Sequence, residues 1–147
     1  MSDGIWHEVG RAVIHPWHHD HYGHMNVRHY APFFDDGIYH FWARMGLPTG
    51  QMAQAHGLHS VTAQETTRFL RELKAGDLIV VEGRLDRVGS RSVTFTLRMR
   101  HAETGTVHAT CEVVEVIFDP VARTSAPMPD PVRAQLLRHL PGGGSAP

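Results

Sequence analysis

The sequence predicts one α+β domain in which an antiparallel sheet of five strands is wrapped around a single long helix. Three observations support this fold class. Apolar and polar residues alternate with a period of two over most of the second half, and one stretch in the first half carries apolar residues at helical spacing. The composition, 41% hydrophobic and 20% charged, is that of a globular chain. The length of 147 residues fits one domain, assigned to residues 1–140, with 141–147 as a flexible Gly- and Pro-rich tail.

The first strand and the helix flank a histidine-rich segment. The strand is expected at about residues 8–15. The helix follows, because large apolar residues recur at helical spacing: Val27, Tyr30, Phe33, Phe34, Ile38, Phe41, Trp42 and Met45. Gly46 ends this pattern, and Pro32 is compatible with it only in the first turn or at a kink. Since apolar residues are so frequent here, we expect the helix to be largely enclosed.

The remaining four strands are expected at about residues 60–70, 78–88, 92–100 and 106–118. In residues 92–100, apolar and polar side chains alternate strictly, so that one face of this strand points inward. Turn-forming residues at 75–77, 89–90 and 103–105 predict hairpin-like links between successive strands. A short terminal helix is expected after Asp130, where Pro131 precedes an apolar stripe.

The charge balance and the chain start exclude several classes of protein. With 14 basic and 15 acidic residues, the net charge of -1 provides no strong field for nucleic acid or for an anionic membrane. The first residues lack the pattern of a secretory signal, and no apolar segment is long enough to span a membrane. We therefore expect a cytoplasmic protein without nucleic-acid or membrane partners. Cys111, the only cysteine, lies in an apolar strand and is expected to be a buried side chain.

The segment between the first strand and the helix carries the candidate chemistry. The N-terminus of a helix has backbone N–H groups without intrahelical partners, and these can hold an oxyanion. Asp20 precedes this helix and can act as a nucleophile or as a general base for water, while Gly23 lets the backbone approach a ligand closely. The local pattern is equally consistent with Asp20 as a helix cap or a turn residue.

Several motifs resemble one family of enzymes. Residues 20–27, Asp-His-Tyr-Gly-His-Met-Asn-Val, resemble the Asp-x-x-Gly-His-x-Asn segment of hot-dog-fold thioesterases of the 4-hydroxybenzoyl-CoA thioesterase-like superfamily. Residues 69–77 and 109–113 resemble the second-strand exit and the last strand of that family. The Gly-His-Met-Asn-Val segment and the Arg-x-Ser-Ala-Pro pattern at 123–127 are most similar to betainyl-CoA thioesterase-like proteins. The resemblance spans about residues 9–138.

This resemblance implies an acyl-CoA thioesterase that hydrolyses a small or medium acyl-CoA to free acid and CoA without a metal or cofactor. Asp20 takes the position of the catalytic carboxylate, and Asn26 and the backbone amide of Val27 that of the group polarising the thioester carbonyl. His24 matches a histidine of plant acyl-carrier-protein thioesterases. Those enzymes have Asn where this chain has Tyr22, so that the role of His24 stays open.

Further residues are expected around an acyl-CoA substrate. The acyl group can be aromatic, a short chain or a quaternary ammonium group, and its candidate contacts are Trp17, Tyr22, Gly23 and Phe34. The candidate contacts of the CoA phosphates are Arg68, Arg71, Ser90, Arg91 and Ser92. The resemblance also implies a homodimer or homotetramer with active sites between protomers. In such an assembly, Glu65, Thr66 and Thr67 would line the site of the partner.

Three alternatives compete with this interpretation: a metal site, a hydratase or dehydratase, and a non-catalytic binding protein. The chain has 13 histidines, but no Glu follows His19-x-His21 at metal-binding spacing and no Cys pair exists, so we expect no metal site. A hot-dog hydratase or dehydratase should show Asp and His five residues apart and then Gly-Asp-x-Asn-Pro, whereas Asp20 and His24 are four apart and Gly76-Asp77 lacks the Asn-Pro. A non-catalytic acyl-CoA-binding protein of the same fold remains the alternative function.

Overall fold

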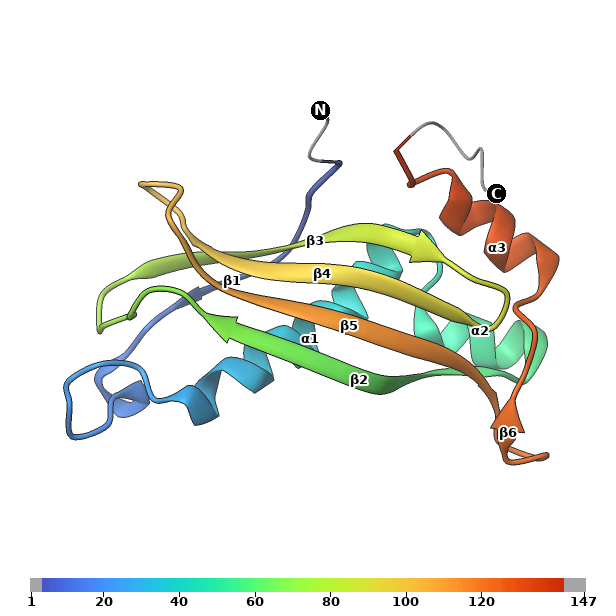
Figure 1. Ribbon diagram of the computed structural model, residues 1–147, viewed down its shortest axis with the longest axis horizontal. Helices are drawn as coiled ribbons and strands as arrows, with labels where there is room; N and C mark the ends of the chain where they lie inside the picture. The colour runs from blue at the N-terminus through green and yellow to red at the C-terminus, as the bar shows by residue number, and fades with distance from the viewer. Residues whose placement is uncertain (1–3, 142–147) are drawn as a thin grey trace.

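The computed structural model describes residues 4–141, which form one curled antiparallel sheet with helices against it (Figure 1). The strands are β1 (His7–Val13), β2 (His59–Phe69), β3 (Leu78–Val88), β4 (Ser92–His101), β5 (Val107–Asp119) and the two-residue β6 (Thr124–Ser125). The helices are α1 (Tyr30–Arg44), α2 (Thr49–His56) and α3 (Asp130–Leu137), with 3-10 turns η1 (Pro16–His18) and η2 (Val27–His29). The predicted α+β class, with five long strands and one long helix, is confirmed.

The strand order is β1-β3-β4-β5-β2, with β6 beside β5. The expected hairpin between β2 and β3 is therefore wrong, because β2 pairs with β5 at the other side of the sheet. The reason lies in the link between them. Gly76 donates to the carbonyl of Ile14 (2.8 Å), and Ile14 donates to the carbonyl of Asp77 (3.0 Å). These bonds, together with the fully buried Leu73, hold the link against β1, so that β3 begins beside β1.

Helix α1 lies against the inner face of the sheet. It buries one face, formed by Tyr30, Phe34, Gly37, Ile38, Phe41 and Trp42. The opposite face, which includes Asp35, Tyr39 and His40, is exposed in the single chain. The expectation of a largely enclosed helix is thus wrong for one protomer. The helical pattern starts at Val27 as predicted, but its first turn is the 3-10 turn η2, and Pro32 falls in the first turn of α1.

The core forms where α1 meets the central strands. Inward-facing apolar residues of β3, β4 and β5 are buried together with the aromatic residues of the helix. Phe41 stacks on Phe95 with ring centroids 4.6 Å apart. Gly83 on β3 leaves room for this contact, because a Cβ atom there would lie 2.6 Å from Phe41 and 2.7 Å from Leu97. Glycine at this position sets how closely the helix can approach the sheet.

Several parts of the chain differ from the expectation. Helix α2 and strand β6 were not predicted, whereas the terminal helix α3 was. Except for Pro141, the predicted tail at 141–147 lies outside the described residues. Among residues 4–141, no helix has the length and apolar character needed to cross a membrane.

We predict that Gly83→Ala destabilises the fold. The added methyl group overlaps Phe41 and Leu97 in a packed core, and overpacking of this kind costs on the order of 1–3 kcal/mol. Urea denaturation of the purified protein measures this loss in the free energy of unfolding. Gly10→Ala is the matched control, since a Cβ atom there meets only Val81, at an ordinary distance of 3.8 Å. Equal stability of the two variants would contradict the close approach at Gly83.

Candidate active site

Asp20 sits in a tight reversal of the chain between β1 and α1. His19 and Met25 form an isolated antiparallel bridge across its base. Inside this loop, the Asp20 N–H donates to the His24 carbonyl and the Gly23 N–H donates to the Asp20 carbonyl, both at 3.0 Å. Gly23 has a φ of +81°, a conformation that side chains other than glycine rarely adopt. The loop therefore fixes the backbone of Asp20 by local contacts.

The Asp20 carboxylate accepts two hydrogen bonds from groups close in sequence. The Tyr22 N–H donates to Oδ1 (2.9 Å), and the Asn26 side-chain amide donates to Oδ2 (3.0 Å). The Tyr22 backbone bond, assisted by Asn26 and by the nearby His21 and His24, holds the pKa of Asp20 below its ordinary value. Asp20 is thus an anion in neutral solution. It forms an Asx-type turn but does not cap the helix.

The helix start offers a free donor beside this anion. The cap is Asn26, whose side-chain oxygen accepts the Arg28 N–H at 3.0 Å. Asn26 therefore links the helix start to Asp20, since its amide nitrogen is bound to the carboxylate. Within residues 4–141, nothing accepts a hydrogen bond from the Val27 N–H, and Val27 is 61% exposed. An N–H in this position can stabilise a developing oxyanion.

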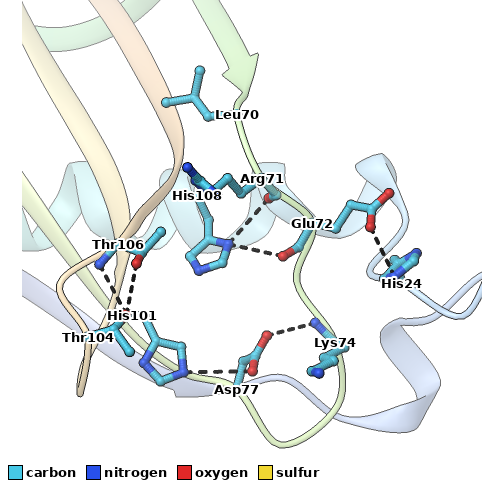
Figure 2. Close-up of a pocket in the computed structure, with 10 residues that line it drawn as sticks. All are labelled: His24, Leu70, Arg71, Glu72, Lys74, Asp77, His101, Thr104, Thr106 and His108. Carbon is cyan, nitrogen blue, oxygen red and sulfur yellow. Dashed lines mark hydrogen bonds and ion pairs between the residues drawn. The ribbon is translucent and has the colours of Figure 1, made fainter.

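Two hollows adjoin this loop at the same end of the sheet. A small one, of about 190 Å³, lies between the helix start and the end of β2, and Val27 and Tyr30 line it. A larger groove, of about 700 Å³, is lined by His24, Leu70, Arg71, Glu72, Lys74, Asp77, His101, Thr104, Thr106 and His108 (Figure 2). Leu70, Arg71 and Glu72 line both, so that the two hollows adjoin each other.

The groove combines basic, imidazole and acidic groups. His24 points toward Glu72, with 3.0 Å between Nε2 and the carboxylate, and His101 lies 3.7 Å from Asp77 (Figure 2). Nδ1 of His108 faces two backbone carbonyls, at 3.3 and 3.1 Å, and must carry the proton there because both partners are acceptors. Lys74, His101 and His108 were missed by the sequence analysis, since they come from separate strands and links without a shared motif.

The predicted acyl contacts lie in different environments in the structure. Trp17 stacks on His15 and is 69% exposed, and Tyr22 stands beside His21 with 75% exposure. Phe34 is 1% exposed and packs in the core, so it does not form part of the surface around Asp20.

Strand β2 is an edge strand and carries four predicted site residues. Glu65 and Arg68 are exposed, and Thr66 and Thr67 are half-buried. The Thr67 hydroxyl donates to the Cys111 sulfur at 3.6 Å, and Cys111 is buried as expected. Partial burial, and then the charges of Asp35 and Glu115, raise the pKa of Glu65.

The predicted CoA contacts fall into two groups. Arg71 lines the groove. Arg68 lies on β2, one residue before the end of this strand. Ser90 and Arg91 belong to the β3–β4 link and Ser92 begins β4, at the end of the sheet opposite to the Asp20 loop (Figure 1). The 11 residues of β3 span roughly 30 Å between the two ends. There the Arg91 guanidinium donates to the Ser125 carbonyl at 2.9 Å. One protomer therefore does not bring these three residues to Asp20.

A third hollow, missed by the sequence analysis, lies between α1, α2 and the first half of β2. Its volume is about 480 Å³, and Asp35, Tyr39 and Trp42 form part of its wall. Glu115 of β5 also lines it, although this side chain is only 3% exposed. The signal was present in the sequence, since Glu115 interrupts the inward-facing apolar positions of residues 106–118. We name this hollow the α1–α2 cavity.

Within the part of the chain that the structure describes, no three His, Cys, Asp or Glu side chains are grouped so as to hold a metal ion. The histidines before α1 contact one another instead: His18 accepts the His15 N–H on Nδ1 (2.9 Å), and its ring lies edge-on to His29. Burial, and then the neighbouring His29 and His15, lower the pKa of His18.

We predict that Asn26→Asp raises the pKa of Asp20. The substitution keeps an oxygen that caps the helix, but it replaces the amide donor on Asp20 with a second carboxylate. In the native chain, the lowered pKa of Asp20 stabilises the fold at pH values above the ordinary pKa of an aspartate. This stabilisation is lost as the pH falls through the lowered pKa of the folded state. NMR titration of the Asp20 carboxyl carbon measures this pKa in the native protein and in the variant. An unchanged pKa in the variant would contradict the hydrogen bond from Asn26.

Comparisons with known proteins give one matching family and several similar structures. The thioesterase-like superfamily matches residues 14–136, most of the chain. A hypothetical Staphylococcus aureus protein solved in complex with CoA superposes with a TM-score of 0.80 at 22% identity, over 96% of this chain and 90% of that one. The probable thioesterase YbaW of Escherichia coli gives 0.78 at 18% identity, over 92% and 100%.

A third structure, the 1,4-dihydroxy-2-naphthoyl-CoA thioesterase of Synechocystis, superposes with a TM-score of 0.73 at 12% identity, over 86% of this chain and 93% of that one. A comparison with curated proteins gives no match. At these identities the superpositions establish the architecture, which is the predicted hot-dog fold, and the family match establishes descent. The chain belongs to the thioesterase-like superfamily.

Proposed function

We propose that this protein is an acyl-CoA thioesterase that hydrolyses a small or medium acyl-CoA to the free acid and CoA. One observation carries the proposal: the anionic Asp20 lies beside a helix start with a free Val27 N–H, in a member of the thioesterase-like superfamily. An anion and an oxyanion donor are the two groups that acyl transfer requires. We further propose that the protein is cytoplasmic and that it needs no metal or cofactor.

In the proposed reaction, the thioester carbonyl oxygen accepts the Val27 N–H. Asp20 either attacks the carbonyl carbon and expels the CoA thiolate, which leaves a mixed anhydride that water then hydrolyses, or takes a proton from a water molecule that attacks the carbonyl carbon and expels the CoA thiolate. Both routes require the carboxylate form, which its two hydrogen bonds maintain at neutral pH. Asn26 positions the carboxylate, and Gly23 keeps the loop open to substrate.

The groove beside the loop is the proposed site for the phosphate end of CoA. Arg71 and Lys74 line it and can bind phosphate oxygens, while His24, His101 and His108 offer further donors (Figure 2). Arg68 on β2 approaches the same end of the sheet. The binding of CoA by the similar Staphylococcus aureus protein supports this part of the proposal. A contribution from Ser90, Arg91 and Ser92 then requires a second protomer.

We also propose a homodimer or homotetramer. Strand β2 has 11 residues and, within residues 4–141, no neighbouring strand on one side; long exposed edges of this kind invite pairing with another chain. Antiparallel pairing of two β2 edges about a twofold axis places the end of one strand beside the start of the other. Glu65, Thr66 and Thr67 lie past the centre of β2, and we propose that they contact the partner across this edge and help to line its site.

For the acyl group, the proposed class is short and polar, in line with the similarity of residues 20–27 and 123–127 to betainyl-CoA thioesterase-like proteins. The exposed rings of Trp17 and Tyr22 stand beside the Asp20 loop and are its candidate contacts.

We predict that Asp20→Asn retains the fold but lowers turnover by about a hundredfold or more, as expected when a positioned base or nucleophile is lost. Release of free thiol from a panel of acyl-CoAs measures the rate, and circular dichroism verifies the fold. Asp36→Asn is the control, since Asp36 is exposed on α1. Near-normal turnover of Asp20→Asn would remove the proposal, and tight binding without thiol release across the panel would favour an acyl-CoA-binding protein.

A second prediction concerns the groove. Arg71→Ala and Lys74→Ala should each raise KM for acyl-CoA severalfold, because each removes a charge-assisted phosphate contact. They should leave KM unchanged for the same acyl group on pantetheine, which lacks the phosphates. Arg91→Ala tests the far end of the sheet in the same assay. Equal effects on both substrates would contradict a phosphate site in the groove.

A further inference from the structure

The Asp20 loop is attached to the rest of the protein through the link between β2 and β3. On the second side of the loop, the Met25 N–H donates to the Leu73 carbonyl at 2.7 Å. On its first side, Nε2 of the His19 ring accepts the Ala75 N–H, also at 2.7 Å. Both sides of this chain reversal are therefore bound to the same short stretch of the link.

The link is held in place independently of the loop. The Gly76 N–H donates to the Ile14 carbonyl, and the Ile14 N–H donates to the Asp77 carbonyl. The Lys74 N–H donates to the Asp77 carboxylate at 2.9 Å, and the side chain of Leu73 is fully buried. Because the link is fixed against β1 and the core, it can serve as the support that positions the loop.

The His19 bond depends on the identity of a side chain, whereas the Met25 bond joins two backbone groups. It connects residues 56 positions apart, and the half-buried ring partly shields it from water. The ring can accept the Ala75 N–H only where Nε2 carries no proton, so the neutral ring with its proton on Nδ1 is the form that binds. A further contact, between His24 and Glu72 at 3.0 Å, is exposed and correspondingly weak.

Each side of the loop leads to one of the two proposed reacting groups. Asp20 follows His19 directly on the first side, whereas the Val27 N–H lies beyond Met25 on the second side. Local hydrogen bonds, such as that from Asn26 to Asp20, set the shape of the loop. The bonds to the link set its place in the fold. Loss of the His19 bond would release the side with the carboxylate, while the Met25 bond still holds the side with the oxyanion donor.

The same link carries the proposed phosphate contacts. Arg71 and Lys74 line the groove, and Ala75, which binds His19, follows Lys74 directly (Figure 2). A substrate held by its phosphates is thus held relative to the link, and through His19 so is the carboxylate. Fixed placement of a reacting group against its substrate provides much of the rate in enzymes.

We propose that His19 is a positioning residue, which holds the Asp20 carboxylate in place relative to bound acyl-CoA through its hydrogen bond with the Ala75 N–H. This statement rests on the proposed thioesterase function, because it takes Asp20 as the reacting group. His19 lies one residue before the motif at 20–27, so the resemblance did not single it out. Its bond to the link is nonlocal and becomes visible only in the folded chain.

Two variants test this role by thiol release from acyl-CoA. His19→Leu removes the acceptor and should lower kcat by about tenfold or more, since misplacement of a reacting group by about an ångström can cost about a hundredfold. KM should stay close to the native value, because the link and its groove are held without His19. His19→Gln should restore most of kcat, since its side-chain oxygen can accept the same N–H. A Gln variant as slow as the Leu variant, or a raised KM without a fall in kcat, would overturn the inference.

Gln135→Leu is the matched control for stability. Its side-chain amide donates to the Met45 carbonyl at 2.8 Å, which is again a bond between distant segments, here 90 positions apart. This bond lies at the end of α1 opposite to the Asp20 loop. Thermal unfolding should show lower stability in this variant and in His19→Leu, but the control should keep the native kcat. An equal fall of kcat in the two variants would reduce His19 to a structural role and contradict the inference.

A measurement without substrate separates this inference from the proposed function. Long-range proton–nitrogen NMR correlations should place the proton of the His19 ring on Nδ1. The Ala75 N–H should exchange with solvent more slowly in the native protein and in His19→Gln than in His19→Leu. A proton on Nε2, or equal exchange of Ala75 in the three proteins, would overturn the His19 anchor alone. A native protein with both signatures that releases no thiol from any acyl-CoA would end the thioesterase proposal, and the positioning role with it, while the bond itself would stand.

Discussion

The aromatic face of α1 packs directly on the inner face of the sheet, and this contact fixes both ends of the helix, beside the Asp20 loop and beside the α1–α2 cavity. Gly83 permits the approach, since any side chain there would meet Phe41 and Leu97. Once Phe41 is seated on Phe95, the start of α1 is fixed beside Asn26 and Asp20. The other end of the helix is fixed as well, because the same packing delivers the Trp42 indole to Glu115.

The Trp42–Glu115 bond joins α1 to β5 inside the core. An apolar residue at 115 would continue the inward face of β5 without desolvating a charge, and such replacements often stabilise a protein. The chain instead has a carboxylate with donors from α1 and β2. Such an arrangement specifies how helix and edge strand are placed, because its hydrogen bonds join α1, β2 and β5.

Much of the fold could be predicted because it depends on local periodicity. Alternation locates the long strands, and the helical spacing from Val27 to Met45 locates the main helix. Periodicity carries no information about which strands are neighbours, so the position of β2 beside β5 was missed. Helix α2 was missed because Gly50 and its short, polar sequence give a weak helical signal. Glu115 could have been recognised, since it shares the inward face with Cys111 and Val113.

The candidate sites also differ in whether they are built by local or by nonlocal contacts. The Asp20 loop is closed by contacts within a few residues of sequence, so a short motif is enough to identify it. The groove and the α1–α2 cavity are built by residues far apart in the chain, such as Glu115 and Trp42, and no short motif describes them. In such an arrangement the reacting groups can stay constant while the residues that surround the acyl group change. The family match therefore bears on the chemistry, whereas the walls of the groove and of the α1–α2 cavity are nonlocal contacts that only the folded chain brings together.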